Sequence, residues 1–392
     1  MKPARLIAAN LAAAAALLVL AALGAALALD LYALVRGPFF RDERSRSAAF
    51  EGIPDAAGRF REMQRIETEF APFVGWRGRP FRGATITIGD DGFRLHPPDP
   101  ADPAGAPVVG LFGGSTAWGV GVADDGTLPA ALDRRLPGVA VRNLGETGYN
   151  SGQSLALLTE RLTAGDRFDL VVLFEGVNDV VSLCRADVSL TGHGEEEVMR
   201  RRLRPPRSHL AATVLEPIAE AAALARRKLA GPPPTPWICD RDPARAEAVA
   251  ETLLRHWEMA HAAAAARGVP LLAALQPVAY VGAPNLAGLG GDRHPGLDRE
   301  FAAVYPRLRA AVAARGRPWI ADLTAALDGG GPVYFDFCHV TERGNDRLAD
   351  ALAERVTAAR PKPAPTSSSP TTPISSTLGV TRASGSAARP SS

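Results

Sequence analysis

Short, mostly apolar runs alternate with helix-like segments through the middle of this chain, and this alternation restricts the fold more than any other feature. The strand-like runs lie at 108–112, 139–143, 169–174, 270–275 and 319–321. The helix-like segments lie at 127–136, 152–162, 243–267, 298–315 and 342–359. Strands and helices in this order form βαβ units, so we predict a flavodoxin-like three-layer α/β/α sandwich with a mainly parallel sheet. In such folds the ligand site lies beyond the carboxyl ends of the strands.

The same alternation sets the predicted domain boundaries. The sandwich is expected over residues 107–360, with an insertion at 182–240 where the strand–helix pattern stops. Residues 31–106 are expected to form a charged, helical stalk and then a small hairpin. The hairpin is expected because alternating β-branched residues lead into an Asp-Gly turn. Residues 361–392 are rich in Pro, Ser and Thr and have few large apolar side chains, so we predict a disordered tail.

The N-terminal residues 1–30 are strongly apolar. No residue from Leu6 to Leu29 is charged, and a transmembrane helix needs about 20 apolar residues, so a membrane anchor is predicted. A cleaved signal peptide is the alternative, although its apolar region is usually about 7–15 residues long. Lys2 and Arg5 favour a cytoplasmic N-terminus and an extracytoplasmic domain. We therefore expect a single-pass protein of the cell membrane, or a secreted protein if this segment is cleaved.

Charge and cysteine content bear on nucleic-acid partners, on cofactors and on a possible disulfide. The chain has 44 basic and 42 acidic residues, a net charge of +2, which gives no reason to expect a nucleic-acid partner. It has no Cys-x-x-Cys pair and no phosphate-binding glycine motif, so we expect neither a metal nor an organic cofactor. Cys184 and Cys239 flank the insertion and are a candidate disulfide if the domain is exported, whereas Cys338 is expected to be buried.

Residues able to carry out nucleophilic catalysis follow the first strand and precede the last helix. Ser115 lies in the run Gly-Gly-Ser-Thr, where a tight glycine turn would expose its hydroxyl at the sheet edge. A serine needs a base, and His339 in the run Asp-Phe-Cys-His can supply one. Asp336 can accept a hydrogen bond from His339 Nδ1 and so direct Nε2 toward the serine.

A developing oxyanion also needs donors that are already in place. Gly148 follows the second strand and can offer its backbone N–H, with Gly145 as the alternative. Asn178 follows the third strand and can offer its side-chain amide, beside the backbone N–H of Ser115. The neighbouring acidic residues Glu175 and Asp179 are expected to be structural, and Gln276 is expected to line the site.

These four motifs, in this order at strand ends, resemble the SGNH/GDSL hydrolase family. Its bacterial membrane-anchored branch is resembled by Gly-Gly-Ser-Thr, by the segment 70–95 with Gly75-Trp76 and Gly92-Phe93-Arg94, and by residues 175–179. The resemblance covers about residues 107–355, although Gly-Gly-Ser-Thr replaces the usual Gly-Asp-Ser. It implies a flavodoxin-like sandwich and an ester hydrolase that needs no cofactor. Carried over residue by residue, it implies a triad of Ser115, Asp336 and His339 with Ser115, Gly148 and Asn178 as oxyanion donors.

The leading hypothesis is a serine hydrolase of carboxylic esters, with an acetylated glycan or a lipid ester of the cell envelope as its substrate. The same triad would serve an O-acyltransferase if water were excluded from the acyl-enzyme. A membrane-tethered binding module without activity is the alternative from a different class. The oligomeric state is not predicted.

Overall fold

The computed structural model describes residues 42–96, 106–203, 236–289 and 296–360, together with separate residues between 3 and 27. Within these ranges the main element is a five-stranded parallel sheet with the order β6-β5-β7-β8-β9. Its strands are β5 (Val108–Gly113), β6 (Ala140–Gly145), β7 (Leu170–Glu175), β8 (Leu271–Leu275) and β9 (Ile320–Asp322). They lie where the sequence predicted strands.

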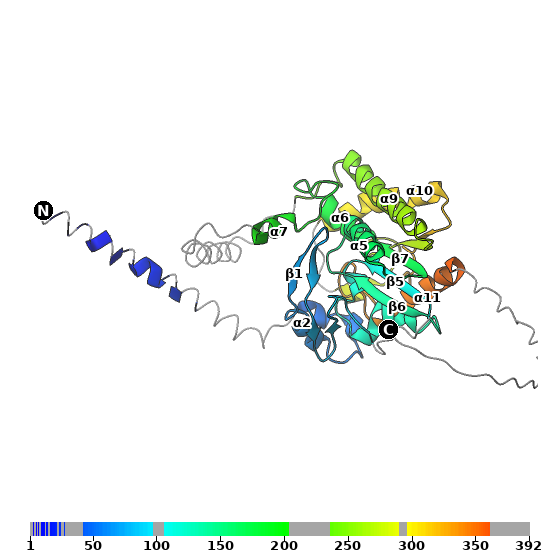
Figure 1. The fold of residues 1–392 in the computed structure, drawn as a ribbon, viewed down its shortest axis with the longest axis horizontal. Coiled ribbons are helices and arrows are strands. Elements are labelled where there is room, and N and C mark those ends of the chain that lie inside the picture. Colours follow the sequence, from blue (N-terminus) through cyan, green and yellow to red (C-terminus); the bar gives the residue numbers. More distant parts are fainter. Residues whose placement is uncertain are drawn as a thin grey trace, which may run out of the picture. The chain divides into compact units, whose positions relative to one another are not determined.

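Helices cover both faces of this sheet (Figure 1). On one face lie α5 (Ser151–Ala164), α6 (Val177–Leu183), α9 (Pro243–Ala265) and α10 (Leu297–Arg315). On the other face lie α4 (Leu128–Asp133) and α11 (Glu342–Ala359). The strands β5, β7 and β8 are buried along their whole lengths, because alternate side chains pack into the two helical layers. This three-layer sandwich agrees with the predicted core.

The segment before the sandwich is folded against it. Two 3-10 turns, η2 (Glu43–Arg46) and η3 (Ala48–Phe50), lead into α2 (Ala56–Met63). Phe50 and Phe60 pack on Phe335, which belongs to the loop before α11. The expected stalk is therefore corrected for residues 42–63, whose apolar and charged side chains are used in contacts with the sandwich.

Two small antiparallel sheets follow α2. In the first, β1 (Thr68–Ala71) pairs with β2 (Gly75–Gly78), and in the second β3 (Phe81–Arg82) pairs with β4 (Thr87–Ile88). The Asp-Gly turn of the expected hairpin is present, since the Gly92 N–H donates to Gly89 O and Ile88 forms a bridge with Arg94. This region thus contains more pairing than the one hairpin expected.

The N-terminal transmembrane helix is a prediction that the structure contradicts. In the part of the chain that the structure describes, no helix is both long and apolar enough to cross a bilayer. The prediction rested on the uncharged composition from Leu6 to Leu29 alone. The membrane anchor, and the membrane as a partner, are therefore withdrawn.

The insertion is described only near its two ends. Short helices complete the described elements there and elsewhere: α3 (Ser115–Trp118), η4 (Asp124–Gly126), α7 (Glu196–Leu203) and η6 (Leu286–Leu289). The middle of the insertion, residues 204–235, and the disordered tail expected at 361–392 lie outside the described residues.

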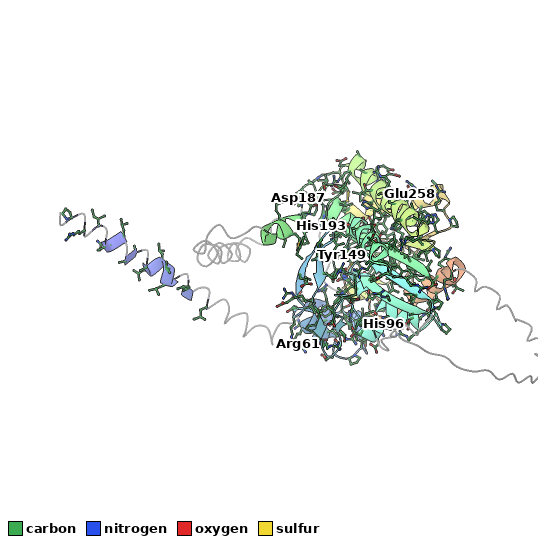
Figure 2. All side chains as sticks on the ribbon, in the orientation of Figure 1. Arg61, His96, Tyr149, Asp187, His193 and Glu258 are labelled. Carbon is green, nitrogen blue, oxygen red and sulfur yellow. A yellow bond between two sulfur atoms is a disulfide. The ribbon has the colours of Figure 1, made fainter. Side chains whose placement is uncertain are left out.

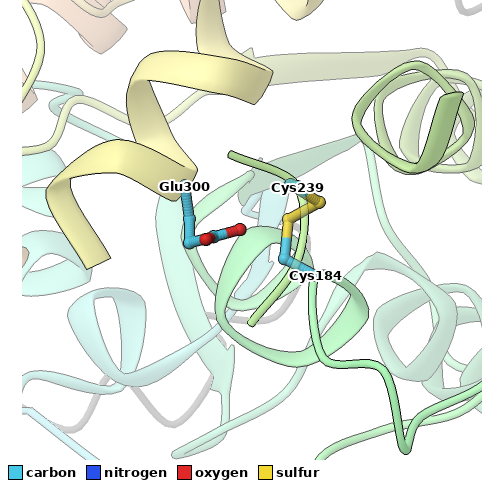
Figure 3. A group of neighbouring side chains, drawn as sticks. All are labelled: Cys184, Cys239 and Glu300. Atoms are coloured by element: carbon cyan, nitrogen blue, oxygen red, sulfur yellow. A yellow bond between two sulfur atoms is a disulfide. The ribbon is translucent and has the colours of Figure 1, made fainter. Parts of the chain in front are cut away.

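A disulfide joins the two ends of the insertion. Cys184 follows α6, and its Sγ lies 2.08 Å from that of Cys239, 55 positions later in the sequence. The Ile238 N–H also donates to Cys184 O, so backbone and side chains close the loop together. Figure 3 shows the Glu300 carboxylate of α10 beside the two sulfur atoms. These three residues have the ligand spacing of a metal site, but a disulfide leaves no thiolate to bind a metal.

We expect the double substitution Cys184→Ser/Cys239→Ser to lower the free energy of unfolding by about 2–4 kcal/mol, because the disulfide restricts the unfolded chain. Urea unfolding under non-reducing conditions measures the loss. Wild-type protein in reductant should show the same loss, and the double variant should not respond to reductant. Equal stability of variant and wild type without reductant would contradict the expectation.

Candidate active site

Ser115 lies at the carboxyl edge of the sheet, one residue after a glycine pair that ends β5. Gly113 has a φ of +154°, and a Cβ placed on it would lie 2.4 Å from Phe174 O in the neighbouring strand. A side chain at this position would therefore push β5 and β7 apart. Gly114 is the N-cap of α3, so the chain turns sharply and Ser115 begins the helix, half-buried, just beyond the end of β5.

His339 reaches Ser115 from the loop before α11. Its Nε2 lies 2.7 Å from Ser115 Oγ, and its Nδ1 lies 2.6 Å from Asp336 Oδ2. Asp336 Oδ1 accepts hydrogen bonds from the backbone N–H groups of Cys338, at 3.0 Å, and His339, at 2.7 Å. Burial opposes ionisation of Asp336, but its interactions with His339 and these N–H groups outweigh burial and hold the pKa of the carboxyl well below its ordinary value.

Asn178, the second residue of α6, lies against the Ser115 turn. Its Nδ2 donates to Tyr149 O at 2.7 Å, and it is 2.2 Å from the position that a Cβ on Gly114 would occupy. Glycine at 114 thus makes room for the amide. An amide group has two N–H donors, so one remains for a ligand at Ser115.

Gly148 is exposed in the loop between β6 and α5 and has a φ of +80°, which favours glycine. No hydrogen bond from its backbone N–H to another described residue is found. The N–H of Gly145, the alternative donor, already donates to Asn143 Oδ1 at 3.1 Å. The geometry therefore favours Gly148 over Gly145 as a donor to a ligand.

The Gly148 loop is held by residues that sequence reasoning did not assign to the site. Glu146 is buried and accepts hydrogen bonds from the N–H groups of Gly78 and Thr147, while Trp76 Nε1 donates to Thr147 O at 3.0 Å. Burial raises the pKa of Glu146 to about 7. Figure 2 labels Tyr149, whose ring packs edge-on against the Trp76 ring. The run Gly-Trp at 75–76 was the only sequence signal for this support.

Gln276 is buried at the end of β8, and its Nε2 donates to Thr116 Oγ1 at 2.7 Å. Thr116 Oγ1 in turn donates to Cys338 O at 3.2 Å. Gln276 therefore connects the serine turn with the histidine loop, which is a structural task beside the site.

Glu175 and Asp179 form a buried acidic pair behind Asn178. Trp257 Nε1 donates to Glu175 Oε2 at 2.7 Å, and Ser151 donates to Asp179 through both its N–H and its hydroxyl. Burial, with the nearby Asp179 charge as a second cause, raises the pKa of Glu175 from its ordinary value of 4.5 to about 8. The pair fixes the start of α5 against α6, and among the described residues neither carboxylate forms a hydrogen bond with Ser115 or His339.

We expect Glu175→Gln to change how stability depends on pH. A raised native pKa means that the folded state holds the proton more tightly, so wild-type stability falls as the pH rises from about 4.5 to about 8. The variant should lack this part of the decline and gain on the order of 1–3 kcal/mol relative to wild type between pH 5 and pH 8. Urea unfolding at several pH values measures it.

Glu258→Gln on the exposed side of α9 is the matched control (Figure 2). It should decline with pH as the wild type does. If Glu175→Gln also followed the wild-type slope, the buried carboxyl would not be the cause.

Residues 111–298 match the sequence model of the GDSL-like lipase/acylhydrolase family. No curated protein matches the chain. This match makes the sandwich a member of the SGNH/GDSL family, a class of hydrolases that act on ester bonds. The matched residues, 111–298, include Ser115, Gly148 and Asn178 and end before Asp336 and His339.

Solved structures are similar over about two thirds of the chain. A lipolytic G-D-S-L family protein from Veillonella parvula is 17% identical, with 64% of this chain and 99% of that one covered and a TM-score of 0.38. An inhibitor-bound aryl esterase from M. smegmatis is 16% identical, over 65% and 100% of the two chains, with a TM-score of 0.37. Est24, a carbohydrate acetylesterase from Sinorhizobium meliloti, is 14% identical over 64% and 99%, with a TM-score of 0.35. At such TM-scores these likenesses carry no argument about function.

Proposed function

We propose that this ester hydrolase works through Ser115 as nucleophile, His339 as general base and Asp336 as the residue that orients the base. The observation that carries the proposal is the continuous chain of contacts from Ser115 Oγ through the imidazole to Asp336, with both distances at hydrogen-bonding length. His339 Nε2 accepts the serine proton while Oγ bonds to the ester carbonyl carbon. The imidazolium then returns this proton to the departing alcohol, and water cleaves the acyl-enzyme by the same two steps.

The negative charge on the carbonyl oxygen would be stabilised by three donors, the N–H groups of Ser115 and Gly148 and the Asn178 amide. The three donors come from the start of α3, from the loop between β6 and α5, and from α6. Because residue 114 is a glycine, the Asn178 amide of α6 can lie close to the Ser115 turn. Preorganised donors stabilise the transition state without any rearrangement during the reaction. Asp336 stays ionised, because its low pKa reflects several hydrogen bonds, and so it can stabilise the imidazolium.

For the substrate, we propose a carboxylic ester in an extracytoplasmic compartment, either an acetylated glycan or a lipid ester of the cell envelope. The Cys184–Cys239 disulfide supports export, since disulfides persist mainly in oxidising compartments. Within the envelope, a glycan and a lipid are told apart by comparing hydrolysis of acetylated oligosaccharides with that of lipid esters.

We expect Ser115→Ala to lower kcat for p-nitrophenyl acetate by about 10⁴-fold or more, because no other group can form the acyl-enzyme. The release of p-nitrophenol measures it, and a fluorophosphonate should label wild type but not the variant. Turnover that persists in Ser115→Ala would exclude this nucleophile. An acyl burst without turnover, relieved by a sugar acceptor, would indicate O-acyl transfer in place of hydrolysis.

We expect Asn178→Ala to lower kcat by about 10²–10³-fold with a small change in KM, because the lost donor acts mainly on the transition state. Steady-state kinetics with p-nitrophenyl acetate separate the two constants. Asn285→Ala is a matched control, because that amide also bonds a backbone carbonyl, Gly330 O at 3.0 Å, away from the proposed donors. Equal kcat values for the two variants would remove Asn178 from the oxyanion hole.

A further inference from the structure

A charged side chain from outside the sandwich touches the proposed triad. Arg44 lies in the η2 turn, and its Nη1 donates to Asp336 Oδ2 at 3.1 Å, across 292 positions of sequence. This is the same oxygen that faces His339 Nδ1. The Asp336 side chain is 3% exposed and that of Arg44 is 29% exposed, so the contact is largely shielded from water.

Arg44 is held in place on its other sides. Asp42 accepts from Nε at 3.0 Å and from Nη2 at 2.8 Å, a two-point contact that fixes the plane of the guanidinium. The same group lies 4.9 Å above the Phe60 ring. Burial alone would lower the pKa of Arg44, but its bonds to Asp42 and Asp336 outweigh burial and raise it, so the cation is permanent.

The loop that carries Asp336 is also fixed by the segment that carries Arg44. Phe335, next to Asp336, packs on Phe50 with ring centroids 4.8 Å apart. Arg343 of α11 donates to Ala49 O at 2.7 Å. The N-terminal segment and the histidine loop therefore form one packed unit, in which a shift of either would change the Arg44–Asp336 distance.

We propose that Arg44 is a positioning residue of the active site, which holds the Asp336 carboxylate toward His339 and moderates its negative charge. The inference rests on the proposed triad. Two backbone N–H groups bind Asp336 Oδ1, and Arg44 and His339 share Oδ2. Partners on both oxygens therefore fix the orientation of the carboxylate. A rigid carboxylate keeps the imidazole aligned with Ser115 during both proton transfers.

The charges around His339 determine the direction in which Arg44 changes the interaction between Asp336 and an imidazolium. Asp336 and Cys338 Sγ, the latter 3.6 Å from Nδ1, adjoin the imidazole from its own loop, and Ser115 faces it from α3. Behind Asp336 stand Arg44 and its partner Asp42 from the N-terminal segment, and the Arg59–Glu342 ion pair joins α2 to the start of α11. A cation beside Asp336 weakens the attraction between the carboxylate and an imidazolium. Arg44 thus weakens the stabilisation that Asp336 gives to an imidazolium, and Asp42 partly offsets this effect.

The experiment is the pH profile of kcat/KM for p-nitrophenyl acetate and of fluorophosphonate labelling, measured on the full chain. Arg44→Gln should lower kcat by about tenfold and shift the acid limb of both profiles to higher pH by about half a unit to one unit. Asp42→Asn should shift the limb in the opposite direction, because it leaves the Arg44 charge less neutralised. Arg44→Lys should keep the wild-type limb and recover only part of kcat, because a lysine carries the charge without the planar two-point contact.

Arg343→Gln is the matched control. It removes an arginine that ties the same N-terminal segment to α11 and does not touch Asp336. It should lower the melting temperature slightly and leave both pH limbs in place.

The proposal is overturned if Arg44→Gln keeps the wild-type acid limb, or if Arg343→Gln moves the limb equally, since both results would mean a purely structural contact. Failure of the triad itself looks different, because the wild type would then show no Ser115-dependent labelling at any pH. Measuring labelling beside hydrolysis keeps these two failures apart.

Discussion

The register of β5 between its two neighbours is the constraint on which the site depends. Gly113 is level with Gly145 of β6 and with Phe174 of β7, so the three strands end within one residue of one another. Whatever follows each strand must then meet at one edge. Ser115, Gly148 and Asn178 are spread along the sequence, yet each lies only a few residues beyond one of these ends. Parallel pairing converts three separate loops into one site, and only the histidine loop has to arrive from elsewhere.

The sequence predicted this part of the molecule well, for physical reasons. A strand buried on both faces must be apolar throughout, so β5 and β7 were recognisable from composition alone. The motifs after them use residues with few structural alternatives, since a side chain at Gly113 would collide with the β7 backbone. Periodicity also located α9, α10 and α11 to within a few residues.

The contacts made by residues 42–96 were not predictable in the same way. Their charged side chains suggested a solvated stalk, and nothing in the local pattern shows that Arg44 meets Asp336 or that Arg59 meets Glu342. Such pairs join residues about 280–290 positions apart, and their partners are decided by tertiary packing. The prediction of a transmembrane helix from the apolar N-terminal residues was wrong for a different reason. An apolar composition permits a membrane span without requiring one.

Buried carboxylates surround the site, and their different environments separate catalysis from structure. Burial, with the charge of Asp179 as a second cause, raises the pKa of Glu175 to about 8, and the Trp257 N–H opposes this rise without offsetting it, so Glu175 is largely neutral at pH 7. Asp336, equally buried, receives two backbone N–H groups, an imidazole and a guanidinium, and its pKa falls. The same desolvation acts on both groups, so the neighbouring charge and the hydrogen-bond donors together decide which one keeps its charge. Asp336, the carboxylate that faces His339, thereby keeps its negative charge at the place where an imidazolium must form. A second ionised carboxylate at the position of Glu175, behind Asn178, would oppose the negative charge that develops on the substrate oxygen.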